Sequence, residues 1–492
     1  MWFVRNLDWF KNKENKGVIK MKNKVLTASL LTGAFLLAAC GGSNNNADTG
    51  TGNAGAGNAG ASAGDNQTTV DSGDMITLTY ANWNLATEAE NNIERRLIAA
   101  FMEEYPHINI QIDESITGDW TEALSIAAST GSLPDVFMLN DTAGPVINGW
   151  LYDLSEMASN DPEFNALPDS IKESTKINGT TYSVPFAQFM LGFYVNRDLF
   201  NNANLNAPEH GISVDDFISS IRQVTDLTTP VIGLNSADSF VEWMPAAINP
   251  NMGFFTFDGS SYHLDSTEMI EAIRVANELT TTGFTYSGLS EDQRSLWVGE
   301  NDIDVFVDGG MAAFHAGTWM NHDFSHQLDF DWDFIGSPGG RPTVTLDIVG
   351  IASTTSHPEE AYLFAKWMGY GEQGTNRRFD IAEDMGIAIH FLPVTGNQQV
   401  LDRYWGIVSI PGMIEAYNHL DNALIDGNKI VPGHVQARFL GLTGIQVADI
   451  DNAQIVEVIH HSIMGNINFP DHASVVNQVA NQEHQNVLSL LN

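Results

Sequence analysis

The 492-residue chain contains a single cysteine, Cys40, and few basic residues. With one thiol it forms no internal disulfide, so a hydrophobic core must stabilise the fold, and a chain this long can bury one. Residues 1–40 hold 7 of the 22 basic and 2 of the 61 acidic side chains, which leaves 15 basic, 59 acidic and a formal charge of −44. Such a surface repels nucleic acid, so nucleic-acid binding is excluded. The acid excess fits either solubility or adaptation to saline or alkaline surroundings.

Long hydrophobic runs are also missing. The sustained apolar stretch at residues 25–39 is shorter than the roughly 20 residues that a membrane-spanning helix needs. Basic residues precede it and Cys40 follows it, which is the arrangement of a secretory signal. Residues 37–40, LAAC, resemble a bacterial lipobox, in which the cysteine is diacylated and becomes the first residue of the mature protein. An ordinary signal peptide that contains a cysteine is the alternative.

The segments on either side of this signal have different interpretations. Residues 1–20 are interpreted as an upstream over-extension of the reading frame, with Met21 as the start, or else as a long basic flank of the signal. Residues 41–74 consist mainly of Gly, Asn, Ala, Ser, Thr and Asp, and this composition predicts a flexible tether. Lipid, tether and folded body together predict a protein anchored to the outer face of the cell membrane.

The folded part begins with a pattern of alternating strands and helices. Residues 75–80 and 108–112 alternate as strands do, and residues 135–139 form an apolar run typical of a buried parallel strand. Two helical stretches separate these strands, and Thr87 and Glu90 predict a capping box for the first. The resulting βαβαβ unit predicts a parallel sheet with helices outside.

A denser pattern occupies residues 176–200. Asn178-Gly179 predicts a tight turn, since glycine adopts positive φ without steric cost. A short β segment follows from Thr181, and Pro185 is expected to end it because proline has no N–H for a ladder. An apolar and aromatic run follows up to Val195, and a buried strand entered through a turn accounts for it.

The sequence of residues 176–200 is more specific than a buried strand requires. "NG-x-x-Y-x-VP" followed by "FYVNRDLF" resembles the crossover signature of the family 1 extracellular solute-binding proteins of ABC importers, the class that includes maltose-binding protein. "F-x-x-x-Y-P-x-I" at residues 101–108 and "G-x-L-P-D-V" at 131–136 match other motifs of that family. The resemblance covers roughly residues 75–395 and becomes weak from about 398.

The resemblance implies an α/β fold with two lobes, the type II periplasmic-binding-protein fold, joined by three interlobe crossovers. Lobe 1 would comprise residues 75–187 and 347–392, and lobe 2 residues 188–346 and 393–492. It also implies a monomer that has no cofactor and no enzymatic activity. Such a protein would capture a carbohydrate, here an oligosaccharide, between its two lobes by hinge closure. The ABC permease transmembrane subunits would then receive the sugar.

Aromatic side chains are the best candidates for the site, because a sugar ring presents an apolar C–H face and a rim of hydroxyls. Trp83 and Trp319 occupy loop positions that the family uses to line its cleft. Packing in the core is the alternative for every tryptophan, including Trp297 and Trp405. The predicted ligand-binding residues are Trp83, Glu88, Trp120, Asn140, Asp141, Gln188, Tyr194, an exposed Trp243, Trp319 and Asp347.

Other chemistry finds less support in the sequence. Asp329, Asp331 and Asp333 are spaced as in the start of an EF-hand loop, but its glycine and final glutamate are missing. Their alternation with aromatic residues predicts a strand with the acids outward, and His460-His461 lacks the spacing of metal ligands. No metal site is predicted. A secreted carbohydrate-active hydrolase and a binding protein for an anionic solute remain the alternatives, although few basic residues speak against the second.

Overall fold

The computed structural model describes residues 75–85, 92–299, 301–389 and 391–492. The predicted signal, lipobox and tether, the Thr87–Glu90 capping box and the candidate Glu88 lie outside these residues. The first described helix begins after Asn92, whose side chain accepts a hydrogen bond from the Arg95 N–H. No helix of the described part is long and apolar enough to cross a membrane.

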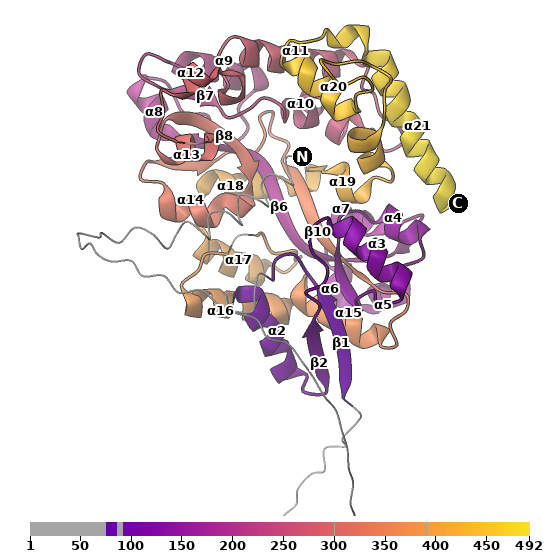
Figure 1. The fold of residues 1–492 in the computed structure, drawn as a ribbon. Helices are drawn as coiled ribbons and strands as arrows, with labels where there is room; N and C mark the ends of the chain where they lie inside the picture. Colours follow the sequence, from indigo (N-terminus) through magenta and orange to yellow (C-terminus); the bar gives the residue numbers. More distant parts are fainter. Residues whose placement is uncertain (1–74, 86–91, 300, 390) are drawn as a thin grey trace, which may run out of the picture. The chain divides into compact units, whose positions relative to one another are not determined.

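A mixed sheet forms the centre of the described chain, with the strand order β2-β1-β3-β10-β6-β8-β7 (Figure 1). β11 pairs with β10, and β9 pairs with β6. β1 is parallel to both β2 and β3, which confirms the predicted βαβαβ unit. The strands are β1 (Ile76–Ala81), β2 (Ile108–Ile112), β3 (Val136–Leu139), β6 (Ser183–Asn196), β7 (Ile232–Leu234), β8 (Met311–Gly317), β9 (Trp332–Phe334), β10 (Thr343–Ile351) and β11 (Leu424–Ile425).

Helices surround this sheet, and their caps follow from the sequence. Ser213 begins α9 by accepting the Asp216 N–H, and the helix buries its apolar face. The α-helices are α2 (Ile93–Glu104), α3 (Trp120–Thr130), α4 (Ala143–Ile147), α5 (Ser155–Asn160), α6 (Pro162–Asn165), α7 (Asp169–Ser174), α8 (Arg197–Asn202), α9 (Val214–Val224), α10 (Phe240–Ile248), α11 (Thr267–Thr281), α12 (Glu291–Arg294), α13 (Asp302–Val307), α14 (Asn321–Gln327), α15 (Pro358–Met368), α16 (Glu372–Met385), α17 (Gln398–Ile407), α18 (Pro411–Tyr417), α19 (Gly427–Ile430), α20 (Ile455–Ile463) and α21 (Ala473–Leu491).

The strand β6 differs from the expectation for Pro185. Asn178 and Gly179 do form the predicted turn, with φ of 51° and 83°, between the short strands β4 (Lys176–Ile177) and β5 (Thr180–Thr181). β6, however, continues through Pro185 instead of ending there. The register against β10 shifts between Asp347 and Ile348, opposite this proline, and β8 pairs with β6 only from Leu191. The missing N–H therefore lies at a bulge, where a ladder tolerates it.

Three segments run side by side where β6 passes through the sheet. β10 is antiparallel to β6, and Gln188 of β6 also bridges to Leu392. These are the three segments expected as crossovers. β6 contributes to both hydrophobic cores: Phe186 and Met190 pack in one, with β1–β3, α2, α15 and α16, whereas Phe193 packs in the other, with α9, α10, α11, α20 and α21.

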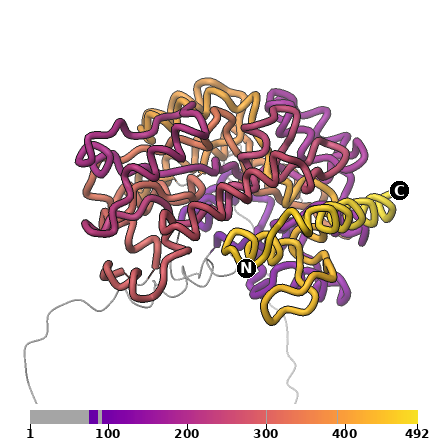
Figure 2. The backbone as a smooth tube through the Cα atoms, turned by 90° about the horizontal axis from the view of Figure 1, so that it is seen from above, coloured from indigo at the N-terminus to yellow at the C-terminus, as the bar shows by residue number. Residues whose placement is uncertain are grey.

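The C-terminal part reaches segments that lie early in the chain. α21 packs against α4 and lies next to it in Figure 1, and Figure 2 shows α21, the yellow C-terminal helix, from above. The Asn178 side chain donates a hydrogen bond to the Leu491 carbonyl, 3.1 Å away. The residues after about 398, where the family resemblance becomes weak, thus contact the turn that precedes β6.

The outward orientation predicted for the three aspartates is wrong at Asp333. This side chain is 2% exposed, and its carboxylate accepts the Gly412 N–H at 2.9 Å and pairs with Arg197. Burial raises the pKa of Asp333. The alternation correctly indicated the strand β9, but the N–H of α18 and the guanidinium of Arg197 provide partners inside.

Candidate functional site

Two aromatic groups lie on one face of the β6–β10 pair. Phe189 is directly opposite Thr345, and Ala187 is directly opposite Asp347. Residues two apart on a strand share a face, as do directly opposed residues in antiparallel strands. The side chains of Phe189 and Asp347 therefore project from the same face, two positions apart.

The first group consists of Trp83 and Trp120, both half-buried. Their rings meet edge to face, with centroids 5.2 Å apart. Trp83 follows β1 in a turn, and Trp120 is the first residue of α3, where its Nε1 donates to the Met138 carbonyl at 2.8 Å. The ends of two parallel strands and the start of one helix thus hold this pair in place, where α/β sheets commonly bind ligands.

A charged pair lies beside this tryptophan pair. The Lys429 ammonium pairs with the Asp347 carboxylate, and the same ammonium lies 5.5 Å from the centre of the Trp83 ring. The two charged side chains are 10% and 11% exposed. Sequence reasoning selected Asp347 but missed Lys429, because residues 424–432 carry no periodic pattern and no family motif. Its only signal was the scarcity of lysine in this acidic chain.

The second group consists of Trp319, Phe189 and Phe391. The Trp319 ring meets the Phe189 ring edge to face at 5.5 Å, and Phe189 meets Phe391 at 6.3 Å. Trp319 lies in the single turn η4 (Thr318–Met320) and folds back over Gly317, where a Cβ would lie 2.1 Å from its ring. Glycine at 317 therefore permits this position of the tryptophan. Phe189 and Phe391 were not among the predicted residues.

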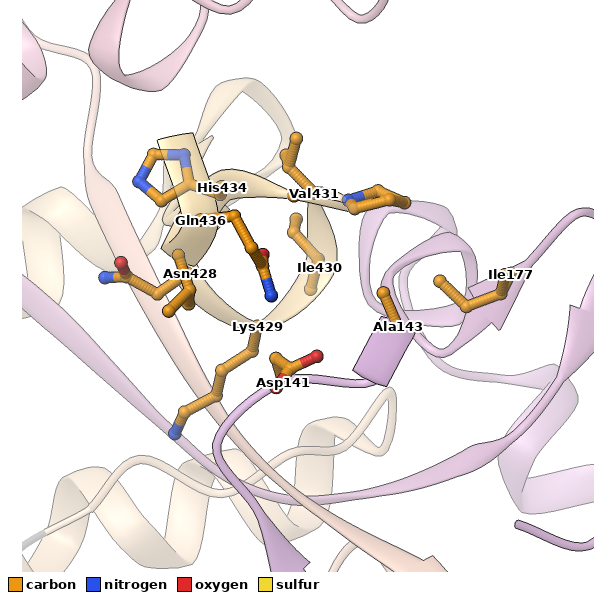
Figure 3. A pocket seen from close by; sticks show the side chains of 12 residues that line it. Asp141, Ala143, Ile177, Asn428, Lys429, Ile430, Val431, His434 and Gln436 are labelled. Atoms are coloured by element: carbon orange, nitrogen blue, oxygen red, sulfur yellow. The ribbon is translucent and has the colours of Figure 1, made fainter. Parts of the chain in front are cut away.

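Asn140 and Asp141 follow β3 but support the local fold. The exposed Asn140 amide donates to the Thr121 hydroxyl at 3.1 Å. The Asp141 carboxylate accepts the Gly144 N–H at 2.7 Å, and burial raises its pKa. Asp141 also lines a narrow recess, without room for a water-sized molecule, together with Ala143, Ile177 and residues 428–436, which Figure 3 shows.

Gln188 ties the first and third crossover segments together. It is 4% exposed, and its amide donates to the Pro393 carbonyl at 2.9 Å. A hydrogen bond also joins it to the buried hydroxyl of Tyr417, whose ring meets Trp405 at 5.2 Å. Burial raises the pKa of Tyr417 to about 12. Gln188 and Trp405 therefore belong to the surroundings of the crossovers.

The structure does not bring Tyr194 and Trp243 to this face. Tyr194 has no exposed surface, its hydroxyl donates to the Asn321 side chain at 2.6 Å, and burial raises its pKa. The expectation that Trp243 is exposed is wrong, because it is 1% exposed and packs against Phe193 and Phe240. Trp297 lies elsewhere, with its Nε1 donating to the Pro230 carbonyl.

A second hollow, of about 600 Å³, lies away from these aromatic groups. Its lining comprises Arg197, Asn201, residues 206–207 and residues 209–212, and His210 is the only aromatic ring among these lining residues. It offers no apolar platform for a sugar. In the described part of the chain, no three His, Cys, Asp or Glu side chains are grouped so that they could hold a metal ion.

The comparisons with solved structures agree on the fold. The model resembles an ABC substrate-binding protein of Listeria monocytogenes in complex with cycloalternan (19% identity, TM-score 0.64, 85% of this chain and 99% of that chain). It also resembles the cyclic alpha-maltosyl-1,6-maltose binding protein of Arthrobacter globiformis (16%, 0.60, 84% and 99%). The GacH receptor of Streptomyces glaucescens, studied with acarbose, is similar too (17%, 0.59, 84% and 98%). At these identities the likeness shows the fold, which confirms the predicted two-lobed α/β class.

No curated protein matches the chain. The family model for bacterial extracellular solute-binding proteins matches residues 85–369, which is more than half of the chain. This match places the chain among the bacterial proteins that bind a solute outside the cell. The chain belongs to the bacterial extracellular solute-binding protein family.

Proposed function

We propose that this protein binds a carbohydrate, an oligosaccharide, between two lobes and delivers it to the transmembrane subunits of an ABC importer. The observation that carries the proposal is the face of the β6–β10 pair from which Phe189 and Asp347 project: Trp319 contacts Phe189, and the Lys429 ammonium joins Asp347 to the pair of Trp83 and Trp120. Tryptophan rings suit the apolar faces of sugar rings, and a carboxylate accepts hydroxyl hydrogens. Two separated platforms fit a ligand of more than one sugar ring.

We propose as lobes the ranges expected from the family, 75–187 with 347–392 and 188–346 with 393–492. β6, β10 and the stretch at Leu392 would be the three connections, and a ligand that contacts both lobes would shift the population toward the closed form. The proposal also includes a diacyl anchor on Cys40, a position at the outer membrane face and action as a monomer.

The experiment is a calorimetric titration of the protein with raffinose, acarbose, cycloalternan and maltotriose, followed by chromatography of each mixture. We expect saturable heat with at least one oligosaccharide and unchanged sugar after prolonged incubation. Released products would instead indicate a hydrolase. Inorganic phosphate and sulfate serve as the anionic arm, and saturable binding of either one with no sugar binding would contradict the proposal.

A further inference from the structure

We propose that the Lys429 side chain contacts the Trp83 ring where a sugar would stack, so that a sugar has to displace this lysine in order to bind. Removal of its ammonium would therefore tighten sugar binding. This inference rests on the proposed function, and it assigns an affinity-determining role to a residue outside the range 85–369 that the family model matches.

The first support is the state of the Trp83 ring. The Lys429 ammonium lies 5.5 Å from its centre, within the range of a cation–π contact. Trp120 meets the same ring edge to face. Two neighbours thus already contact the half-buried ring, and a sugar that stacks on it has to compete with one of them. Trp120 is fixed in α3 by its bond to the Met138 carbonyl, so Lys429 is the neighbour that can leave.

The second support is the way in which the backbone places Lys429. β11 pairs with β10 through Leu424 and Ile425, and the Asp426 side chain then accepts the Asn428 N–H and begins α19. The Lys429 carbonyl accepts both the N–H and the hydroxyl of Thr142 at 3.3 Å. The lysine backbone is therefore held from both sides, while its side chain extends away from the recess in Figure 3.

The third support is the charge of Asp347. The Asp347 side chain is 11% exposed, and its carboxylate pairs with the Lys429 ammonium. When the ammonium leaves, the carboxylate becomes an acceptor for sugar hydroxyls at the edge of the ring. Displacement of Lys429 thus exposes the platform and its polar edge in one step, and the cost of displacement lowers the affinity of the wild-type protein.

The experiment measures the dissociation constant of the tightest-binding oligosaccharide of the panel for wild type, Lys429→Met and Lys429→Arg. The methionine keeps the chain length but loses the cation, so we expect binding about 3- to 30-fold tighter, the range that a cation–π contact spans. Arginine keeps a cation that can contact the ring, so we expect Lys429→Arg to bind the sugar less tightly than Lys429→Met. Lys172→Met, which removes a pair with the exposed Asp169 in α7, is the control for loss of charge, and its affinity should stay unchanged.

Unchanged binding by a folded Lys429→Met would overturn the inference. Weaker binding would also overturn it, because it would show that Lys429 holds the sugar. If Lys429→Met does not fold because Asp347 loses its partner, the double variant Lys429→Met/Asp347→Asn is compared with Asp347→Asn alone. The double variant should then bind the sugar more tightly than Asp347→Asn. Failure of every sugar to bind both wild type and variant would overturn the proposed function as well. Binding by the variant alone would support both.

Discussion

At the residue scale, the structure divides the tryptophans by what their rings contact. Trp243 is buried in a core, whereas Trp319 is half-buried and contacts Phe189 beside the proposed site. A core ring stabilises the folded state, but a ring that contacts ligand contributes mainly to binding. The two residues therefore form a matched pair of variants.

We expect Trp319→Ala to weaken oligosaccharide binding strongly, with little change in the melting temperature of the empty protein. Trp243→Ala should do the reverse and cost about 3–5 kcal/mol of folding free energy, without changing affinity per folded molecule. Calorimetric titration and thermal unfolding of both variants measure the two effects. A Trp319→Ala protein that melts early yet binds normally would show that Trp319 is a core residue.

A second prediction concerns acid stability. Burial lowers the pKa of the His315 imidazole to about 4, and its ring packs against Phe193. The unfolded chain binds a proton there below about pH 6.5, while the folded one stays neutral down to about 4, so stability should fall with decreasing pH across that window. The full effect is about 3 kcal/mol, at 1.36 kcal/mol per pKa unit.

Denaturant unfolding at several pH values between about 4 and 7 measures this dependence. His315→Gln should unfold with a slope against pH that is smaller by up to about one proton. Burial also lowers the pKa of His434, so part of the dependence should remain in the variant. A slope equal to that of wild type would contradict the assignment to His315.

At the element scale, β6 is the strand on which the fold depends, since it pairs with three other strands and supplies both cores. Gly192 lies inside it, and a Cβ there would lie 2.5 Å from the backbone of Gly336. The close approach of these two backbones requires glycine. It also explains why the apolar run of this strand is interrupted at that position.

Gly192→Ala should therefore destabilise the protein by about 1–3 kcal/mol or more, because the neighbouring backbone has to move. Gly406 in α17 is the matched control, since a Cβ there meets no atom within 4 Å. Gly406→Ala should stabilise by about 0.5–1 kcal/mol through helix propensity. Equilibrium unfolding of the two variants gives both values, and equal effects would contradict the close approach.

At the scale of the whole molecule, the proposed mechanism is a change in population between open and closed forms. A saturating sugar from the panel should reduce the radius of gyration measured by solution scattering, because closure brings two bodies together. Phosphate, which is not expected to bind, serves as the control. Tight binding of a sugar without any compaction would count against closure.

The membrane anchor is a prediction at the same scale, although Cys40 lies outside the described residues. Cys40→Ser removes the only thiol that could be acylated, so the variant should appear in the soluble fraction while the wild type stays with membranes. Cell fractionation and labelling with a lipid precursor measure this. A variant that is still acylated and still membrane-bound would show that the lipobox assignment is wrong.

Much of the fold was predictable from the sequence, because it depends on local rules. The turn at Asn178-Gly179 and the strands and helices of the first βαβαβ unit follow from backbone preference and from hydrophobic periodicity. Family motifs added the two-lobed class. Local rules failed at Pro185 and at Asp333. At Pro185 a bulge in the pairing with β10 removes the cost of the missing N–H. At Asp333 an N–H from a distant segment offsets the cost of burying the carboxylate.

For the site, the sequence by itself determined the kind of side chain available: tryptophans at element ends, carboxylates in excess and few cations. Only the tertiary structure decided which of them meet. It buried Tyr194 and Trp243, and it placed Lys429 between Asp347 and Trp83, from segments about 80 and 350 residues away. Such contacts arise when strands from distant parts of the chain pair, and a pattern within about 20 residues, the span of one or two elements, carries no record of them.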